Sequence, residues 1–240
     1  MDASRIIIIP DLHGREFWRE AVRDFREDTR VVFLGDYMDP YGDEWIYWSD
    51  AFKSLQDIIE FKKANPDRVT LLFGNHDLHY LYPQLMGSRF NFDQAPLLRN
   101  TFTDNLDAFQ MAADFVIGEK RYLFSHAGIH PSWVRKYPAL FGSYEELTAD
   151  TFNRLMFVPE FVDALAEVSR SRGGSSLVGS MIWADIYDHE LSVPIASDVV
   201  QICGHTRLPD EKPLELNGVI CLDCRRAFLL TEKGIRSFVS

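Results

Sequence analysis

Five short segments of the chain combine a glycine with carboxylate, imidazole or amide side chains. They are PDLHG (10–14), GDYMD (35–39), GNHD (74–77), SHAG (125–128) and CGHT (203–206). Each follows an apolar run that is typical of a strand. In open α/β sheets, ligands gather at the carboxyl ends of strands, so we expect these segments to share a site. A mixture of Asp, His and Asn favours borderline divalent ions such as Mn²⁺, Fe²⁺ or Zn²⁺ over a soft thiolate site.

The spacing within the segments suggests how a cation would be held. Asp11 and His13 are two residues apart, and in an extended segment both side chains would point the same way. Gly35 and Gly74 would let the backbone approach a crowded centre. A carboxylate such as Asp36 can bridge two ions. A single glycine–aspartate pair is also typical of an ordinary turn. The presence of all five segments in order, each at a strand end, instead favours an active site.

A parallel sheet is the element that would bring these segments together. Apolar runs predict strands at 4–10, 30–34 and 69–73, and amphipathic spacing predicts helices at 16–27 and 50–64. This βαβαβ order indicates a parallel sheet. The remaining expectations are a mostly helical or irregular 76–113, a hairpin at 114–118 and 121–125, helices within 144–170, and strands near 198–203, 218–222, 226–231 and 234–239. We expect one domain over residues 1–240, with a more antiparallel second half.

Composition narrows the class of protein. The 240 residues are 46% apolar and 25% charged, and the formal net charge is −11. Such a charge repels nucleic-acid phosphates and membrane surfaces, so we expect neither long nucleic acid nor membrane as a partner. The apolar run at 6–9 is too short for a secretory signal. Three cysteines, Cys203, Cys221 and Cys224, fit a reducing compartment, and we expect them to be buried in a cytoplasmic protein.

The order D-x-H-G, G-D-x-x-D, G-N-H-D, S-H-A-G, G-H-T resembles the calcineurin-like metallophosphoesterases. GDYMD is similar to the GDYVD of the branch that contains the protein serine/threonine phosphatases and the symmetrical diadenosine tetraphosphatases. MIWADIY (181–187) is similar to the L-L-W-S-D-P segment of that branch. The resemblance runs from Asp11 to about Cys224. It implies an α/β fold, a four-layer αββα sandwich with mixed sheets, and two divalent ions, with Mn²⁺ first and Fe, Zn or Mg as the other options.

The resemblance also implies roles for individual residues. The metal ligands would be Asp11 and His13 on the first ion, Asp36 on both, and Asn75, His126 and His205 on the second. A hydroxide between the ions would attack phosphorus. His76 would protonate the leaving group as general acid, with Asp39 orienting it and keeping it protonated. Asn75 would also touch the phosphate, and Asp77 would support the site or cap a helix.

One departure from the branch concerns the phosphate. The branch has an arginine after GDYVD that clamps it, whereas Pro40 follows Asp39 here. Arg15 and Arg225 are candidates to bind the substrate in its place, although a surface role is the plainer interpretation of each. The aromatic side chains between Tyr41 and Trp48 would be either a helix-packing core or a lid that stacks an aromatic group.

The function that these residues favour is a dinuclear metal-dependent phosphoric ester hydrolase. A phosphomonoesterase is the preferred form of this function. A nucleotide or dinucleoside polyphosphate hydrolase, or a phosphodiesterase, on the same site is the alternative. A third hypothesis is a binding module that keeps the fold without catalysis.

Overall fold

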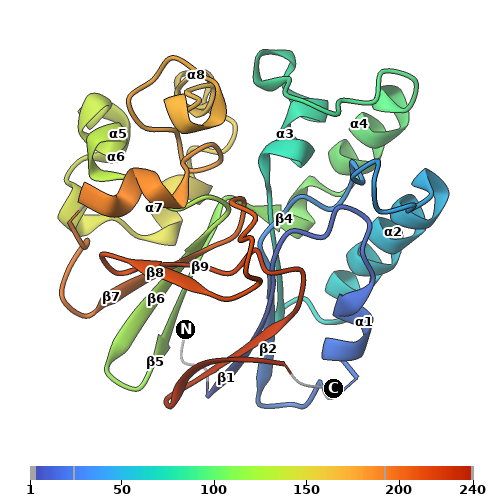
Figure 1. The fold of residues 1–240 in the computed structure, drawn as a ribbon, viewed down its shortest axis with the longest axis horizontal. Coiled ribbons are helices and arrows are strands. Elements are labelled where there is room, and N and C mark those ends of the chain that lie inside the picture. Colours follow the sequence, from blue (N-terminus) through green and yellow to red (C-terminus); the bar gives the residue numbers. More distant parts are fainter. Residues whose placement is uncertain (1–3, 24, 192, 239–240) are drawn as a thin grey trace. The chain divides into compact units, whose positions relative to one another are not determined.

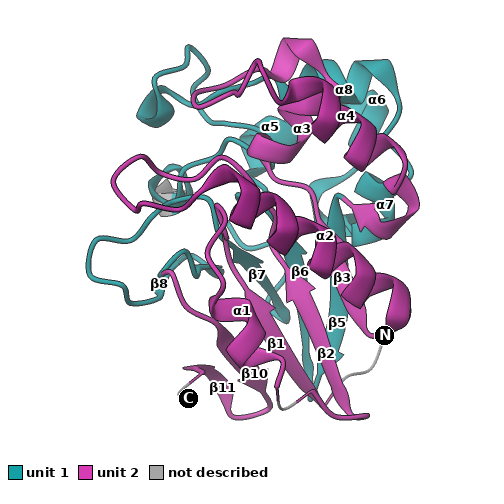
Figure 2. Cartoon of the chain, turned by 90° about the vertical axis from the view of Figure 1, so that its right-hand side faces the viewer, with its two compact units in different colours: residues 1–3, 111–224 teal, residues 4–110, 225–240 magenta. Residues whose placement is uncertain are grey.

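The computed structural model describes residues 4–23, 25–191 and 193–238. The chain divides into two compact units: unit 1 contains Met111–Cys224, and unit 2 contains Ser4–Gln110 and the C-terminal segment from Arg225 (Figure 2). Each unit has one mixed sheet and its own helices, which confirms the expected α/β class. A single domain over 1–240 stays a prediction. Positions 24 and 239, within the expected helix 16–27 and strand 234–239, lie outside the described residues.

The sheet of unit 2 has the order β11-β10-β1-β2-β3-β4. Its strands β1, β2 and β4 are labelled in Figure 1. Its parallel part is β1 (Arg5–Ile9), β2 (Thr29–Phe33), β3 (Val69–Leu72) and β4 (Phe109–Gln110). Ile6, Ile7, Ile8 and Ile9 are all fully buried, as an apolar run in a sheet covered on both faces should be. The three strands predicted in this half are therefore confirmed.

The helices of unit 2 are α1 (Phe17–Ala21), α2 (Trp48–Ala64), α3 (Asn75–Leu81) and α4 (Ala95–Thr103), with short 3-10 turns at Pro83–Leu85 and Leu106–Ala108. The predicted helix 16–27 is wrong beyond Ala21. Phe25, an apolar residue within the predicted range, instead packs its ring against Phe61 of α2, with centroids 5.2 Å apart. A tertiary contact, and not a helical repeat, accounts for the apolar residue at this position.

The last two strands complete the sheet of unit 2. β10 (Phe228–Thr231) runs antiparallel to β1, with Leu229 opposite Ile7, and β11 (Gly234–Ser237) pairs with β10. The sequence predicted these strands but placed them in the second half of the fold. Apolar patterning identifies a strand without identifying the strand it pairs with.

The sheet of unit 1 has the order β5-β6-β7-β9-β8, formed by β5 (Ala112–Ile117), β6 (Lys120–Ser125), β7 (Val199–Cys203), β9 (Val219–Cys221) and β8 (Leu214–Leu216). The predicted hairpin is β5–β6. The more antiparallel half that we expected is only partly right, because β6, β7 and β9 are parallel. The parallel pair β6–β7 ends at one edge, where the SHAG and CGHT segments follow.

The helices of unit 1 are α5 (Pro131–Lys136), α6 (Pro138–Phe141), α7 (Ala149–Asn153) and α8 (Pro159–Leu165), with 3-10 turns at Tyr144–Glu146, Arg170–Arg172 and Ile186–Leu191. Their core is aromatic: Phe141 contacts the rings of Trp133, Phe152 and Phe161. All three cysteines are buried thiols, as expected.

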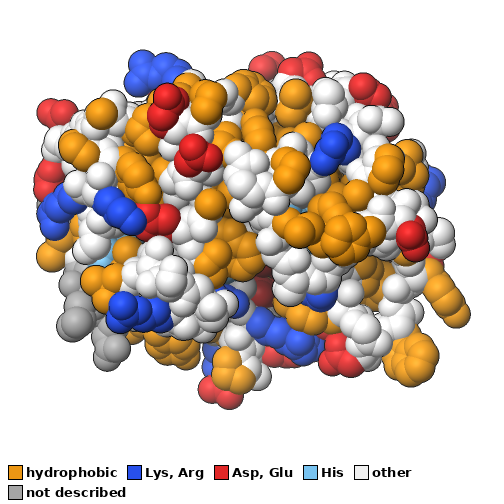
Figure 3. Space-filling view, turned by 90° about the horizontal axis from the view of Figure 1, so that it is seen from above, with side chains coloured by type: hydrophobic (Ala, Val, Ile, Leu, Met, Phe, Trp, Pro, Cys, Tyr) orange, Lys and Arg blue, Asp and Glu red, His pale blue; other side chains and the backbone are white. Residues whose placement is uncertain are grey.

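Charged and apolar side chains alternate over the face drawn in Figure 3, with Lys and Arg next to Asp and Glu. Among the residues that the structure describes, no helix combines the length and apolar character needed to cross a bilayer.

Candidate active site

The loops after β1 and β2 are joined through the backbone of Asp36. Its carbonyl oxygen accepts hydrogen bonds from the N–H groups of Leu12, at 3.1 Å, and His13, at 2.7 Å. The expectation that residues 11–13 are extended is wrong at His13, whose φ is 46°. The left-handed turn is what allows two successive N–H groups to reach one carbonyl oxygen. Asp11 and His13 are nevertheless both buried at this end of the sheet.

Asp77 fixes the loops after β2 and β3 to each other. Its Oδ2 accepts from the backbone N–H of Gly74 at 2.7 Å and of Asp36 at 2.8 Å, and its Oδ1 accepts from that of Tyr37 at 3.1 Å. Burial and the neighbouring Asp36 raise the pKa of Asp77, whereas the three backbone N–H groups favour its ionised form. Its role is therefore to support the site and to cap α3, as the sequence suggested.

The environment of Asp36 and His13 suits a divalent cation. His13 Nδ1 lies 2.9 Å from the carbonyl oxygen of Met38, so its proton belongs there and the Nε2 lone pair, 3.4 Å from Asp36 Oδ2, is left for a metal. Burial, followed by the charge of Asp11, raises the pKa of Asp36, and burial lowers the pKa of His13. Two neighbouring buried carboxylates and a neutral imidazole form a donor set that a cation would stabilise. Asn75, the first residue of α3, is buried as well.

Asp39 and His76 form a direct pair, with His76 Nδ1 2.8 Å from Asp39 Oδ2. The same Asp39 oxygen lies 2.9 Å from His79 Nε2, and Tyr80 donates its hydroxyl to the other. Burial opposes ionisation of Asp39, but the hydrogen bonds from His76 and His79 outweigh it and its pKa is lowered. The backbone N–H of His76 also donates to Asp36 Oδ1 at 2.9 Å, which connects the pair to the loop after β2.

Burial lowers the pKa of His76 to about 4, although the hydrogen bond with Asp39 acts in the opposite direction. The positive charge of Arg89 lowers it further. Because a carboxylate oxygen can only accept, a neutral His76 ring would carry its proton on the Nδ1 that faces Asp39. Asp39 contacts the ring through Nδ1, and its role in orienting His76 and keeping it protonated stays a prediction.

Arg89 is the site residue that sequence analysis missed. Its Nη1 donates to the carbonyl oxygen of Asp39 at 2.6 Å, and its Nη2 lies 2.9 Å from His76 Nε2 and 3.5 Å from His13 Nε2. Its guanidinium lies over the ring of Tyr41, 3.8 Å from the centroid. The guanidinium thus faces the imidazoles of two motifs while coming from the irregular segment between α3 and α4.

The two arginines that the sequence offered lie elsewhere in unit 2, against Glu44. Arg15 makes a two-pronged ion pair with that carboxylate, both N···O distances being 2.7 Å. Arg225 Nε lies 3.8 Å from the same carboxylate. Both side chains are partly buried, in contrast to a fully solvated surface arginine.

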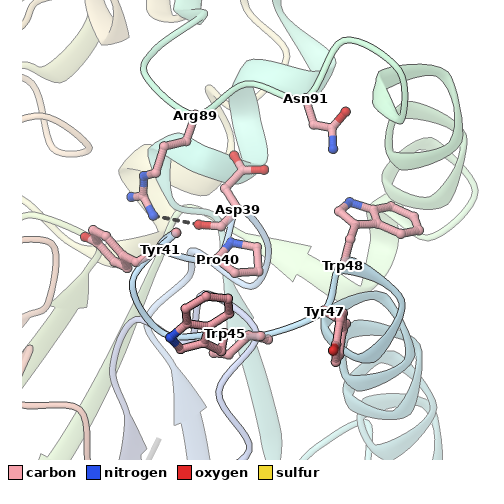
Figure 4. Close-up of a pocket in the computed structure, with 10 residues that line it drawn as sticks. Asp39, Pro40, Tyr41, Trp45, Tyr47, Trp48, Arg89 and Asn91 are labelled. Carbon is pink, nitrogen blue, oxygen red and sulfur yellow. Dashed lines mark hydrogen bonds between the residues drawn. The ribbon is translucent and has the colours of Figure 1, made fainter.

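A cavity of about 350 Å³ lies beside this cluster, lined by Asp39, Arg89, Asn91 and the loop from Pro40 to Trp48 (Figure 4). The packing-core interpretation of the loop aromatics is wrong for Trp45 and Tyr47, whose side chains are 90% and 75% exposed. Trp48 is half-buried, and its ring stacks on that of Phe52 of the same helix with centroids 5.0 Å apart.

Within unit 1, two predicted ligands lie close to each other. His126 Nε2 and His205 Nδ1 are 3.1 Å apart, and both imidazoles are buried. The rings of Trp183 and His205 are perpendicular, with centroids 5.6 Å apart. Asp185 pairs with Arg172 at 2.9 Å and accepts the N–H of Tyr187, so it braces its loop.

Solved structures with a similar fold include two phosphatases. A cold-active protein-tyrosine phosphatase of a psychrophilic Shewanella species matches with a TM-score of 0.60 at 17% identity, over 99% of this chain and 81% of that one. A protein serine/threonine phosphatase of Saccharomyces cerevisiae matches with a TM-score of 0.55 at 13% identity, over 98% and 80%. No curated protein sequence matches the chain. At these identities the likeness concerns the fold alone.

Asp and His side chains gather at the strand ends of this mixed α/β fold in groups that could hold a metal ion. The family model for calcineurin-like phosphoesterases matches residues 4–207. The chain belongs to this family, and it is a hydrolase that acts on phosphoric ester bonds. The family expected from the motifs is thereby confirmed.

Proposed function

We propose that the protein is a phosphomonoesterase with two divalent ions, Mn²⁺ first among them, and that it acts in the cytoplasm. The observation that carries this proposal is the Asp39–His76 pair, which is hydrogen-bonded to a carboxylate of the metal-binding loop. A phosphomonoester needs a proton on its leaving oxygen, and this pair can supply one. The proposed metal ligands are those that the sequence predicted: Asp11, His13, Asp36, Asn75, His126 and His205.

Bound divalent ions would polarise the phosphoryl oxygens and lower the pKa of the attacking water. His76 Nδ1 stays on Asp39, so Nε2 is the atom that delivers a proton to the leaving oxygen as the P–O bond breaks. For this transfer the ring must be protonated in the substrate complex, and the negative charge of a bound phosphate acts in that direction.

The phosphate needs a cation, and three arginines are candidates. Arg15 and Arg225 share Glu44, whose charge they already neutralise. Arg89 instead faces His76 and His13, and it donates to a neutral acceptor, the backbone carbonyl oxygen of Asp39. A bound phosphate would give its guanidinium a two-pronged anionic acceptor. We therefore assign the main phosphate contact to Arg89, with Asn75 as a second contact.

Substitution of each arginine by methionine tests this assignment. A hydrogen-bonded contact to a charged group supports a loss of roughly 10- to 150-fold in kcat/KM for Arg89→Met. Arg15→Met and Arg225→Met, which remove the same charge, serve as matched variants and should lose less. An unchanged Arg89→Met beside an impaired Arg15→Met would move the clamp to Arg15.

The reaction class is tested with a matched pair of substrates. Protein stripped with chelator and reloaded with Mn²⁺ is assayed on para-nitrophenyl phosphate and on its bis-para-nitrophenyl diester. A faster monoester rate agrees with the proposal. A faster diester rate would favour the second candidate, a phosphodiesterase or a nucleotide or dinucleoside polyphosphate hydrolase. The feature that keeps this candidate open is the aromatic cavity beside Asp39.

A further inference from the structure

The cavity of unit 2 adjoins the proposed chemistry. Asp39 and Arg89 are both part of its lining. The same Arg89 side chain lies 2.9 Å from the His76 nitrogen that we assign to the leaving oxygen. A group attached to that oxygen would therefore meet this cavity. Its volume, about 350 Å³, falls within the range of small-molecule sites.

The walls of the cavity are suited to a flat ring. Pro40, Ile46 and the aromatic side chains of the loop supply apolar surface (Figure 4). Trp45 is 90% exposed, and its φ of 55° is a backbone conformation that bulky residues rarely adopt. Outliers of this kind gather at ligand sites, where a side chain is held away from the core. The indole of Trp45 is thus presented at the cavity instead of being packed.

Two N–H donors enter the same space. The indole nitrogen of Trp48 is buried and, in the described part of the chain, has no hydrogen-bond partner. Stacking on Phe52 fixes that indole. The Asn91 side-chain oxygen accepts from the N–H of Gln94 at 3.2 Å, which leaves its amide nitrogen for the cavity. Figure 4 shows the nitrogen atoms of Asn91 and Trp48 turned toward the space between them.

A buried donor without an acceptor is unfavourable, so the ligand should supply acceptors. Its ring should also be uncharged or weakly charged, because the exposed Asp43 belongs to the same loop and would repel a further anionic tail. A purely hydrocarbon ring would leave both N–H groups unpaired. These requirements together describe a heteroaromatic ring with acceptor atoms on its edge.

We infer that this cavity is the leaving-group subsite and that it takes a nucleobase-type ring, so that the substrates are nucleoside monophosphates. Trp45 stacks on the ring, and the N–H groups of Trp48 and Asn91 bind acceptors on its edge. Arg89 lies between the subsite and the phosphate. This inference names the substrate class of the proposed phosphomonoesterase and rests on that function.

The test compares adenosine 5′-monophosphate with ribose 5-phosphate, which has the same leaving oxygen and no base. In the Mn²⁺-loaded protein the ratio of the two kcat/KM values should be roughly 5- to 100-fold, the worth of one stacked base. Trp45→Ala and Asn91→Leu should each lower this ratio. Phe157→Ala, which removes another exposed aromatic side chain, should leave it unchanged. A ratio near one in the wild type, or an unchanged ratio in both cavity variants, would overturn the assignment.

A binding measurement separates the subsite from the catalytic proposal. Adenosine, which has no phosphate, should bind the chelator-treated protein in a calorimetric titration, and Trp45→Ala should weaken that binding. Binding of adenosine without turnover of any phosphate ester would keep the subsite and remove the phosphomonoesterase proposal. Turnover of para-nitrophenyl phosphate without adenosine binding would keep the phosphomonoesterase proposal and remove the subsite. A higher kcat/KM for phosphotyrosine than for adenosine 5′-monophosphate would also overturn the inference, because the phosphotyrosine ring lacks edge acceptors.

Discussion

Replacement of Asp77 by alanine should lower the free energy of unfolding by more than the substitution of a nearby surface residue does. The side chain is fully buried and accepts three backbone N–H groups, those of Asp36, Tyr37 and Gly74. In Asp77→Ala all three donors lose their acceptor. A buried unpaired donor costs about 1–3 kcal/mol. Because water can enter the space that the carboxylate leaves, we expect a total loss of about 3–5 kcal/mol in the free energy of unfolding.

Asp77→Asn provides a graded comparison. The asparagine oxygen can keep the two N–H groups of Gly74 and Asp36, which share one carboxylate oxygen. Its amide group would then face the N–H of Tyr37, donor against donor. One unpaired donor implies a loss of about 1–3 kcal/mol. Asp43 is an exposed residue of the loop between β2 and α2. The free energy of unfolding of Asp43→Ala should therefore stay within about 0.5 kcal/mol of the wild-type value.

Urea unfolding followed by circular dichroism measures these differences. Chelator must be present throughout, because a metal that binds only the folded state would add its own stabilisation. The expected order of midpoints is Asp43→Ala, Asp77→Asn, Asp77→Ala, from highest to lowest. The reasoning fails if Asp77→Ala loses less than about 1 kcal/mol, or if it is no less stable than Asp77→Asn.

Three further predictions concern the site and the pH dependence. His76→Asn should lower the rate on a phosphate ester with a poor leaving group by about 10²–10⁴-fold, with metal content by mass spectrometry unchanged; a fully active variant would refute the acid assignment. Asp36→Asn should lose both activity and bound metal, and retention of two ions would argue against a bridging role. Burial, assisted by His130, lowers the pKa of His189 to about 3, so the unfolded state binds a proton that the folded state does not between pH 6.5 and 3. Stability should fall as the pH drops through that range, by at most about 1.4 kcal/mol per pH unit for this group, and His189→Phe should remove its share of the slope.

Sequence analysis located the strand-end segments because strands, glycines and ligand-type side chains are local signals. Asp36, Asp39 and His76 could therefore be identified before their contacts were known, and Asp39 does pair with His76. The left-handed turn at His13 could not be anticipated, since it depends on two hydrogen bonds to the carbonyl oxygen of Asp36. Local spacing carries no information about such tertiary restraints.

Arg89 escaped prediction for a related reason. It lies 50 residues from Asp39 along the chain, in an irregular segment with no motif, yet it donates to the carbonyl oxygen of Asp39. Arg15 and Arg225 attracted notice because they stand beside motifs, but Glu44 holds both. The stacking of Arg89 on Tyr41 is a signal that exists only in three dimensions. The pairing of β10 with β1 was hidden in the same way.

The glycine that precedes Asp36 limits how this active site can evolve. A Cβ atom on Gly35 would lie 2.4 Å from the backbone nitrogen of Gly74, and the φ of Gly35 is 101°. The two loops that carry Asp36 and Asn75 therefore touch through main-chain atoms. A mutant library that replaces one of these loops must replace the other with it. The stretch from Tyr41 to Trp48 has no such constraint at Gly42, where an added Cβ would meet nothing within 4 Å. Substitutions that change the choice of substrate should therefore accumulate between Tyr41 and Trp48 among descendants of this protein. The loops that carry Asp36 and Asn75 should stay invariant.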